Sequence, residues 1–134
     1  MSQENVEIVN RAIEAVNERD LEGYLSCCTE DMQLITPLTE IGGAYEGVDG
    51  IRRFFADLED VSPDFRLAVD RIQGVGADRV MAFLRVRATG RASGLPAAAE
   101  TPTSNVYDLA DGKIRRLRIF FDRHEALEAA GLSE

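Results

Sequence analysis

Few side chains in this chain have the type and spacing needed for acid–base or nucleophilic chemistry. His124 is the only histidine, and the two cysteines, Cys27 and Cys28, are adjacent. These three residues do not supply the three or four convergent ligands of a zinc site, and they serve a His-based nucleophilic triad no better. We therefore predict no metal site, leave the catalytic residues unknown, and expect the cysteines to be packing thiols.

The remaining polar candidates are residues that would bind a small molecule through hydrogen bonds. They are Asn105, Tyr107, Thr36 and Tyr45. Residues 104–122 alternate as two strands joined by a tight turn, which places Asn105 and Tyr107 on one face of the first strand. Tyr45 lies in a loop, and two roles stay open for it: a lid over the mouth of a pocket or an anchor for the loop.

The turn of this hairpin decides which way Asn105 points. In a two-residue loop, Asp111-Gly112, Asn105 would lie beside Arg118 on the basic face. In a three-residue loop that begins at Ala110, Asn105 would lie opposite Leu117 on the apolar face. We choose the second loop because it keeps the large side chains of the first strand on the apolar face, where burial of each contributes roughly 1.5–3 kcal/mol.

An interior amide needs a hydrogen-bond partner. A buried amide without one costs roughly 1–3 kcal/mol. Asn105 therefore bonds either neighbouring groups, as a structural amide, or a ligand in a pocket on the concave face of the sheet. The residues alone leave both alternatives open.

The periodicity of the apolar residues predicts the elements that position these side chains. Helical spacing and then period-two alternation indicate the order helix, helix, strand, helix, followed by four strands in a meander. We expect helices from Ser2, after Asp20, at 48–61 and at 123–130, and strands at 32–36, from 65, at 80–87, at 97–109 and in the second half of the hairpin. Helices gathered before an antiparallel sheet indicate an α+β class, and we expect one domain over residues 1–134.

The two faces of the predicted sheet differ in chemistry. The inner face and the helices opposite it offer apolar walls for a pocket: Ala12, Val16, Phe54, Phe55, Leu84, Val86, Leu117, Ile119 and Phe121. The outer face mixes apolar groups with arginines: Met81, Phe83, Arg85, Arg87, Val106, Arg116, Arg118 and Phe120. Exposed apolar side chains among arginines suit an interface, so we predict a homodimer packed sheet to sheet.

Charge and composition argue against several kinds of partner. The formal net charge of -9 repels phosphate backbones, so we expect no nucleic-acid partner. No apolar run approaches the ~20 residues that span a membrane, and the polar N-terminus shows no secretory signal. We expect a cytoplasmic protein without membrane contact. The sequence has no glycine-rich phosphate loop, and we expect no cofactor.

Three segments, in this order, resemble the SnoaL-like proteins of the nuclear-transport-factor-2-like superfamily. They are RAIEAVNERDLEGYLSCCTEDMQLITP, AYEGVDGIRRFF and VYDLADGKIRRLRIFFDRHEAL. The resemblance implies a cone-shaped, curved and mostly antiparallel sheet wrapped around three N-terminal helices, a short C-terminal helix, and a homodimer. It does not specify a function, because the superfamily includes ketosteroid isomerases, polyketide cyclases, dehydratases, epoxide hydrolases and non-catalytic modules.

The resemblance to ketosteroid isomerases implies where acid–base residues would lie. In those enzymes an Asp base works with a Tyr and a protonated Asp that stabilise an oxyanion. The matching positions here are Thr36 for the base, Ala12 and Phe55 for tyrosines, and Asn105 for the protonated Asp. Thr36 has no useful basicity near neutral pH, whereas Asn105 can still donate a hydrogen bond to a carbonyl or oxyanion.

Two hypotheses of function follow. The first is a pocket protein whose largely apolar ligand carries a carbonyl or hydroxyl contacted by Asn105, Tyr107 and Thr36. Such a protein could be a cyclase- or isomerase-like enzyme that lacks the usual acidic base. The second is a non-catalytic dimeric binding or interaction module with a small or empty cavity.

Overall fold

The structure of the chain is a computed structural model that describes residues 2–36, 44–61, 64–87 and 100–132. Its helices and strands are α1 (Ser2–Glu18), α2 (Leu21–Ser26), β1 (Cys28–Ile35), β2 (Tyr45–Glu46), α3 (Gly47–Val61), β3 (Arg66–Val75), β4 (Arg79–Arg87), β5 (Glu100–Ala110), β6 (Lys113–Phe120) and α4 (Arg123–Ala129). The predicted order is confirmed, with β2 added between β1 and α3. A two-residue strand is too short to show alternation. The expected strand residues 97–99 lie outside the described part of the chain.

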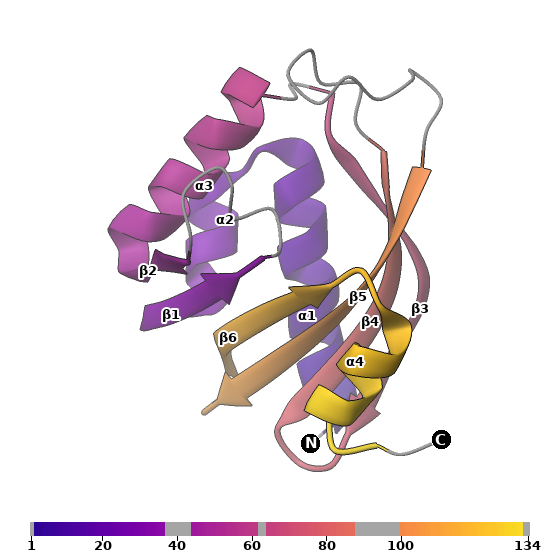
Figure 1. The fold of residues 1–134 in the computed structure, drawn as a ribbon. Helices are drawn as coiled ribbons and strands as arrows, with labels where there is room; N and C mark the ends of the chain where they lie inside the picture. Colours follow the sequence, from indigo (N-terminus) through magenta and orange to yellow (C-terminus); the bar gives the residue numbers. More distant parts are fainter. Residues whose placement is uncertain (1, 37–43, 62–63, 88–99, 133–134) are drawn as a thin grey trace.

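The strands form one curved sheet in the order β2-β1-β6-β5-β4-β3. The last four strands make the predicted antiparallel meander. Strand β1 joins the sheet by pairing parallel to β6, and β2 pairs antiparallel to β1. The predicted α+β class with a mostly antiparallel sheet is thus confirmed, and Figure 1 shows how the sheet bends around the early helices.

Helices α1, α2 and α3 cover the concave face of the sheet (Figure 1). Helical spacing places Val9, Ile13 and Val16 of α1 on one side, and they share an apolar core with Val80 and Leu84 of β4. The sheet face that meets these helices is therefore the interior face. None of the described helices is both long and apolar enough to cross a membrane.

Helix α4 packs on the opposite face of the sheet (Figure 1). Asp122 caps it by accepting a hydrogen bond from the backbone N–H of His124, and aspartate is one of the residues that favour this position. Ala126 of α4 then buries Met81 and Val106, both of which are fully inaccessible to solvent. The expectation that these two side chains are exposed for a second subunit is therefore wrong. A helix of seven residues carries too short a pattern to show which surface it covers.

The β5–β6 hairpin turns at Asp111-Gly112, so the predicted three-residue loop is wrong. Both residues have positive φ angles, 53° and 75°, as a two-residue type I′ turn requires. Ala110 pairs with Lys113 instead of forming part of the loop.

A β-bulge next to the turn then brings Asn105 to the interior face. The pair Leu109–Ile114 is followed by the pair Asp108–Arg116, which leaves Arg115 without an opposite residue. In a two-residue loop without a bulge, Asn105 would lie opposite Arg118. The extra residue shifts this register by one position, so Asn105 pairs with Ile119, and the predicted partner, Leu117, pairs with Tyr107. The inward orientation of Asn105 is confirmed, although the loop and the partner from which it was inferred are wrong.

Candidate functional site

Asn105 lies in the middle of the sheet, on the side that faces the helices. Its neighbours across the sheet are Ala82 of β4 and Ile119 of β6, and only 3% of its surface is exposed. Strand alternation turns it to the same face as Tyr107 and away from Val106 and Asp108. An amide is therefore held inside the main apolar core of the molecule.

The hydrogen bonding of Asn105 is incomplete. Its Nδ2 donates to the hydroxyl oxygen of Tyr107 over 3.5 Å, which is long for a hydrogen bond. Its Oδ1 is buried and has no hydrogen-bond partner. An unsatisfied buried acceptor costs roughly 1–3 kcal/mol, so this oxygen is a strong acceptor for any group that reaches it.

Tyr107 stays a neutral phenol at physiological pH. Burial, together with the nearby Cys28 thiol, raises its pKa to about 12, and the hydrogen bond from Asn105 acts in the opposite direction. A phenol with this pKa is no general base near pH 7, but it retains a proton that it can donate.

Tyr24 and Cys28 are neighbours of this pair that the sequence did not single out as site residues. Burial raises the pKa of Tyr24 well above its ordinary value, and the adjacent Cys28 and Tyr107 add to the effect. Burial likewise raises the pKa of Cys28 to about 12, and its Sγ donates to the backbone oxygen of Tyr24 over 3.3 Å. Both cysteines are free and buried, which confirms them as packing thiols. The helical spacing of Tyr24 was the one signal that it faces the interior.

Most residues of the predicted apolar wall belong to the main apolar core of the molecule. The main core contains Ala12, Val16, Phe55, Leu84 and Leu117, with Phe54 and Ile119 packed against it and Val86 half-buried. The rings of Tyr24, Phe55 and Phe54 meet edge to face, with centroids 5.4 and 5.9 Å apart. Phe121 does not belong to this wall, because it follows the end of β6 and 48% of its surface is exposed. The strand alternation that predicted it stops one residue earlier.

The other two polar candidates occupy the edge of the core near β1 and β2. Thr36 follows β1 and is buried. The hydroxyl of Tyr45 donates to Asp57 of α3 over 2.7 Å, and the guanidinium of Arg53 lies 5.0 Å from its ring centre. Burial, followed by the contact with Asp57, raises the pKa of Tyr45 to about 12. Of the two roles left open, the structure favours the anchor, because Tyr45 ties β2 to α3.

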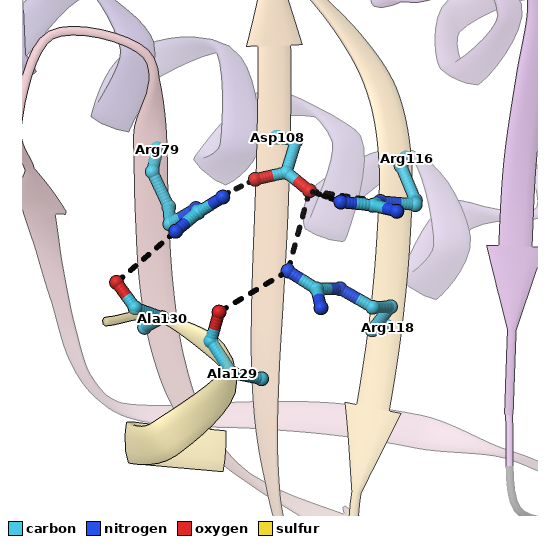
Figure 2. Close-up of polar contacts among 6 residues, drawn as sticks. All are labelled: Arg79, Asp108, Arg116, Arg118, Ala129 and Ala130. Carbon is cyan, nitrogen blue, oxygen red and sulfur yellow. Dashed lines mark hydrogen bonds and ion pairs between the residues drawn. The ribbon is translucent and has the colours of Figure 1, made fainter. Parts of the chain in front are cut away.

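Acidic groups are scarce around Asn105. Among the described residues, the only buried acid is Asp108, and it lies on the α4 side of the sheet. There it accepts from Arg79 Nε over 2.7 Å and from Arg116 Nη2 over 2.8 Å, while Arg118 Nη2 lies at 3.4 Å (Figure 2).

Two of these arginines, Arg79 and Arg118, also hold the end of α4. Arg79 Nη1 donates to the carbonyl oxygen of Ala130 over 3.1 Å, and Arg118 Nη2 donates to that of Ala129 over 3.4 Å (Figure 2). Arginines near the last carbonyls of a helix stabilise its C-terminus. The arginines of the predicted basic surface are therefore largely neutralised within the chain, and Arg118 together with Arg79 attaches α4 to the sheet.

Comparison with known proteins agrees with this architecture. A family model described as a SnoaL-like domain matches residues 9–117. The delta subunit of calcium/calmodulin-dependent protein kinase type II from Oryctolagus cuniculus is 27% identical over 115 residues, which cover 83% of this chain. The chain spans only 21% of the length of that kinase.

Solved structures show the same fold at low sequence identity. Bal32a, from a soil-derived mobile gene cassette, has a TM-score of 0.80 at 20% identity, over 95% of each chain. A protein with a ketosteroid isomerase-like fold from Catenulispora acidiphila, in complex with trimethylamine, has a TM-score of 0.74 at 16% identity, over 95% of this chain and 94% of that one. TerC, co-crystallised with polyporic acid, has a TM-score of 0.74 at 26% identity, over 96% of this chain and 98% of its own.

Proposed function

The chain belongs to the SnoaL-like domain family, and on that premise we propose that it is a small-molecule binding protein. Its ligand is largely apolar, carries a carbonyl or hydroxyl group, and lies against the interior face of the sheet at Asn105 and Tyr107. The proposal is limited to binding, because the carboxyl that would serve as a general base in the related isomerases is replaced by Thr36.

The unsatisfied oxygen of Asn105 carries this proposal. Other amides of the chain show what a structural asparagine looks like. Asn17 donates to the backbone oxygen of Leu67 over 2.9 Å and accepts from its N–H over 2.8 Å, and the buried Asn5 donates to the backbone oxygen of Ala77 over 3.0 Å. Asn105 Oδ1 has no such partner. An interior acceptor left open among apolar side chains fits a ligand-binding site better than a purely structural role.

The similarity to TerC supports a ligand of this kind. TerC is 26% identical to this chain and was co-crystallised with polyporic acid. We therefore include polyporic acid among the probes for this chain.

A thermal-shift screen tests the proposal. The panel contains polyporic acid and small apolar ketones, alcohols and phenols, and each is measured on the wild type, Asn105→Leu and Asn5→Leu. A ligand at 100 times its Kd should stabilise the wild type by about 2.7 kcal/mol. The shift should be reduced or lost in Asn105→Leu and kept in Asn5→Leu, which removes a buried amide elsewhere.

The unliganded variants give a second readout. Asn5→Leu breaks one hydrogen bond and should lower the free energy of unfolding by about 1 kcal/mol. Asn105→Leu removes an unsatisfied oxygen and should leave the stability unchanged or higher. If no member of the panel stabilises the wild type, or if Asn105→Leu keeps every shift, the pocket proposal is wrong.

A homodimer remains a second proposal, through the part of the outer sheet face that α4 leaves open. Phe83 and Phe120 are only partly buried there, and Arg85 and Arg87 lie on the same face, paired with Glu100. Such a mixture suits a partner surface. Sedimentation at micromolar concentration should show a dimer that Phe83→Glu weakens, and a wild type that is purely monomeric would refute it.

A further inference from the structure

Asn105 and Tyr107 each have a hydrogen-bonding function in use and at least one open. The amide uses a donor, Nδ2, toward the Tyr107 hydroxyl, and its acceptor Oδ1 has no partner. The Tyr107 oxygen accepts that bond, and its own O–H makes no hydrogen bond to any residue that the structure describes. The pair therefore presents an open acceptor next to an open donor, on one face of β5.

From this arrangement we infer that the ligand group at Asn105 is a hydroxyl, as in an alcohol, a phenol or an enol, and not an isolated carbonyl. The inference rests on the proposed function and narrows its ligand class. A hydroxyl donates its proton to Asn105 Oδ1 and at the same time accepts the proton of Tyr107. A ketone only accepts, so it satisfies the donors of the pair and leaves Oδ1 buried without a partner.

The protonation state of Tyr107 agrees with this assignment. With a pKa near 12, raised mainly by burial, the phenol keeps its proton at neutral pH and acts as a donor. The amide of Asn105 does not titrate. The pattern of an open acceptor beside open donors is therefore constant across the physiological pH range.

A charged donor fits the pair less well than a hydroxyl. An ammonium group would satisfy Oδ1, but it has no lone pair to accept the Tyr107 proton. It would also be buried among apolar side chains without a counter-charge, which is unfavourable. The buried carboxylate among the described residues, Asp108, is engaged by arginines on the other side of the sheet. A neutral hydroxyl compound is the class that meets both open functions.

Matched probes test the inference directly. The pairs are 2-naphthol with 2-methoxynaphthalene, and 1-tetralol with 1-tetralone, so each hydroxyl compound has a counterpart of nearly equal shape that cannot donate. Binding is measured by calorimetry on the wild-type chain. The hydroxyl member of each pair should bind about tenfold more tightly, which corresponds to 1.4 kcal/mol.

Two variants locate the preference. In Asn105→Leu the affinity ratio within each pair should fall to about one, whereas the control Asn5→Leu should keep it. In Tyr107→Phe the affinity of 1-tetralone should fall, and 1-tetralol should keep a preference through Oδ1. Because Tyr107→Phe only removes an oxygen, it keeps the test decisive if Asn105→Leu does not fold.

The outcomes separate this inference from the proposed function. If the ketone and the ether bind as tightly as their hydroxyl counterparts, or if the preference survives in Asn105→Leu, the inference is overturned while the binding function stands. If neither the four probes nor the screening panel binds, the proposed function fails and the inference fails with it.

Discussion

Two buried polar residues on the same strand have opposite environments. Asn105 faces the helices with its oxygen unsatisfied, and Asp108, three residues later, faces α4 with three arginines around its carboxylate. Strand alternation alone separates them, because residues an odd number apart lie on opposite faces. The first is the residue that we propose for ligand binding, and the second stabilises the fold.

Replacing Asp108 by Asn should therefore be costly. The carboxylate is 6% exposed and accepts charge-assisted bonds from Arg79 and Arg116, so its loss leaves partly buried guanidinium groups without a counter-charge. We expect Asp108→Asn to lower the free energy of unfolding by about 3 kcal/mol, measured by urea denaturation. Asp70→Asn is the matched control: its ion pair with Arg85 is about half exposed and should be worth about 1 kcal/mol or less. Equal losses in both variants would contradict this assignment.

The same carboxylate predicts a pH dependence. Burial acts to raise the pKa of Asp108, but hydrogen bonds and charges from Arg79 and Arg116 outweigh it, so its pKa lies below the ordinary 3.8. Stability from a depressed carboxyl pKa is fully present above the ordinary value and is lost as the pH falls through the folded-state value. The difference in unfolding free energy between the wild type and Asp108→Asn should be constant near neutral pH and shrink below about pH 4. A difference that stays constant in acid would contradict the shift.

At the scale of elements, the β5–β6 hairpin decides where both residues point. Its turn uses two residues with positive φ, and its bulge at Arg115 corrects the register that such a turn would otherwise impose. Without the bulge, Asn105 would share a face with the arginines. A local irregularity of one residue thus determines whether Asn105 faces the interior of the molecule.

Substitution of Gly112 tests the turn. Gly112 has a φ of 75°. A Cβ at this position would make only an ordinary van der Waals contact, with Ile8 Cδ1 at 3.9 Å, so the cost of a side chain comes from the backbone conformation alone. Gly112→Ala should destabilise the chain by about 1 kcal/mol, and Gly112→Asn by less, because Asn tolerates this region. Thermal unfolding of both variants gives the comparison. Equal stability of Gly112→Ala and the wild type would be inconsistent with a type I′ turn.

At the scale of the whole molecule, the sheet has a separate apolar cluster on each face. The helices α1 to α3 cover one face and the single short helix α4 covers part of the other. Met81 and Val106 depend on α4 for their burial, and the arginines around Asp108 fasten its last carbonyls. The C-terminal helix therefore limits how much of the outer face a second subunit can reach.

Loosening α4 should expose that face. Ala126 lies on the side of α4 that faces the sheet and is completely buried. Ala126→Asp therefore places a charge in this contact and should lower the free energy of unfolding by about 3 kcal/mol. Sedimentation velocity should then show assemblies larger than those of the wild type, because Met81 and Val106 become accessible. His124→Asp, at an exposed site of the same helix, is the control and should change neither quantity measurably. An unchanged free energy of unfolding in Ala126→Asp would mean that α4 contributes little to the burial of Met81 and Val106.

The sequence by itself determined the α+β class and the order of the main elements, because both follow from local periodicity. Only the tertiary structure decided the hairpin register, the burial of Met81 and Val106 under α4, the anchoring of Tyr45 to Asp57 and the exposure of Phe121. These features depend on which segments, distant in the sequence, pack against each other. A bulge or a short helix changes these contacts without leaving a periodic signal in the sequence. The open oxygen of Asn105 belongs to the same group: the bulged register turns the amide inward, and the packed neighbours decide whether a partner is within reach.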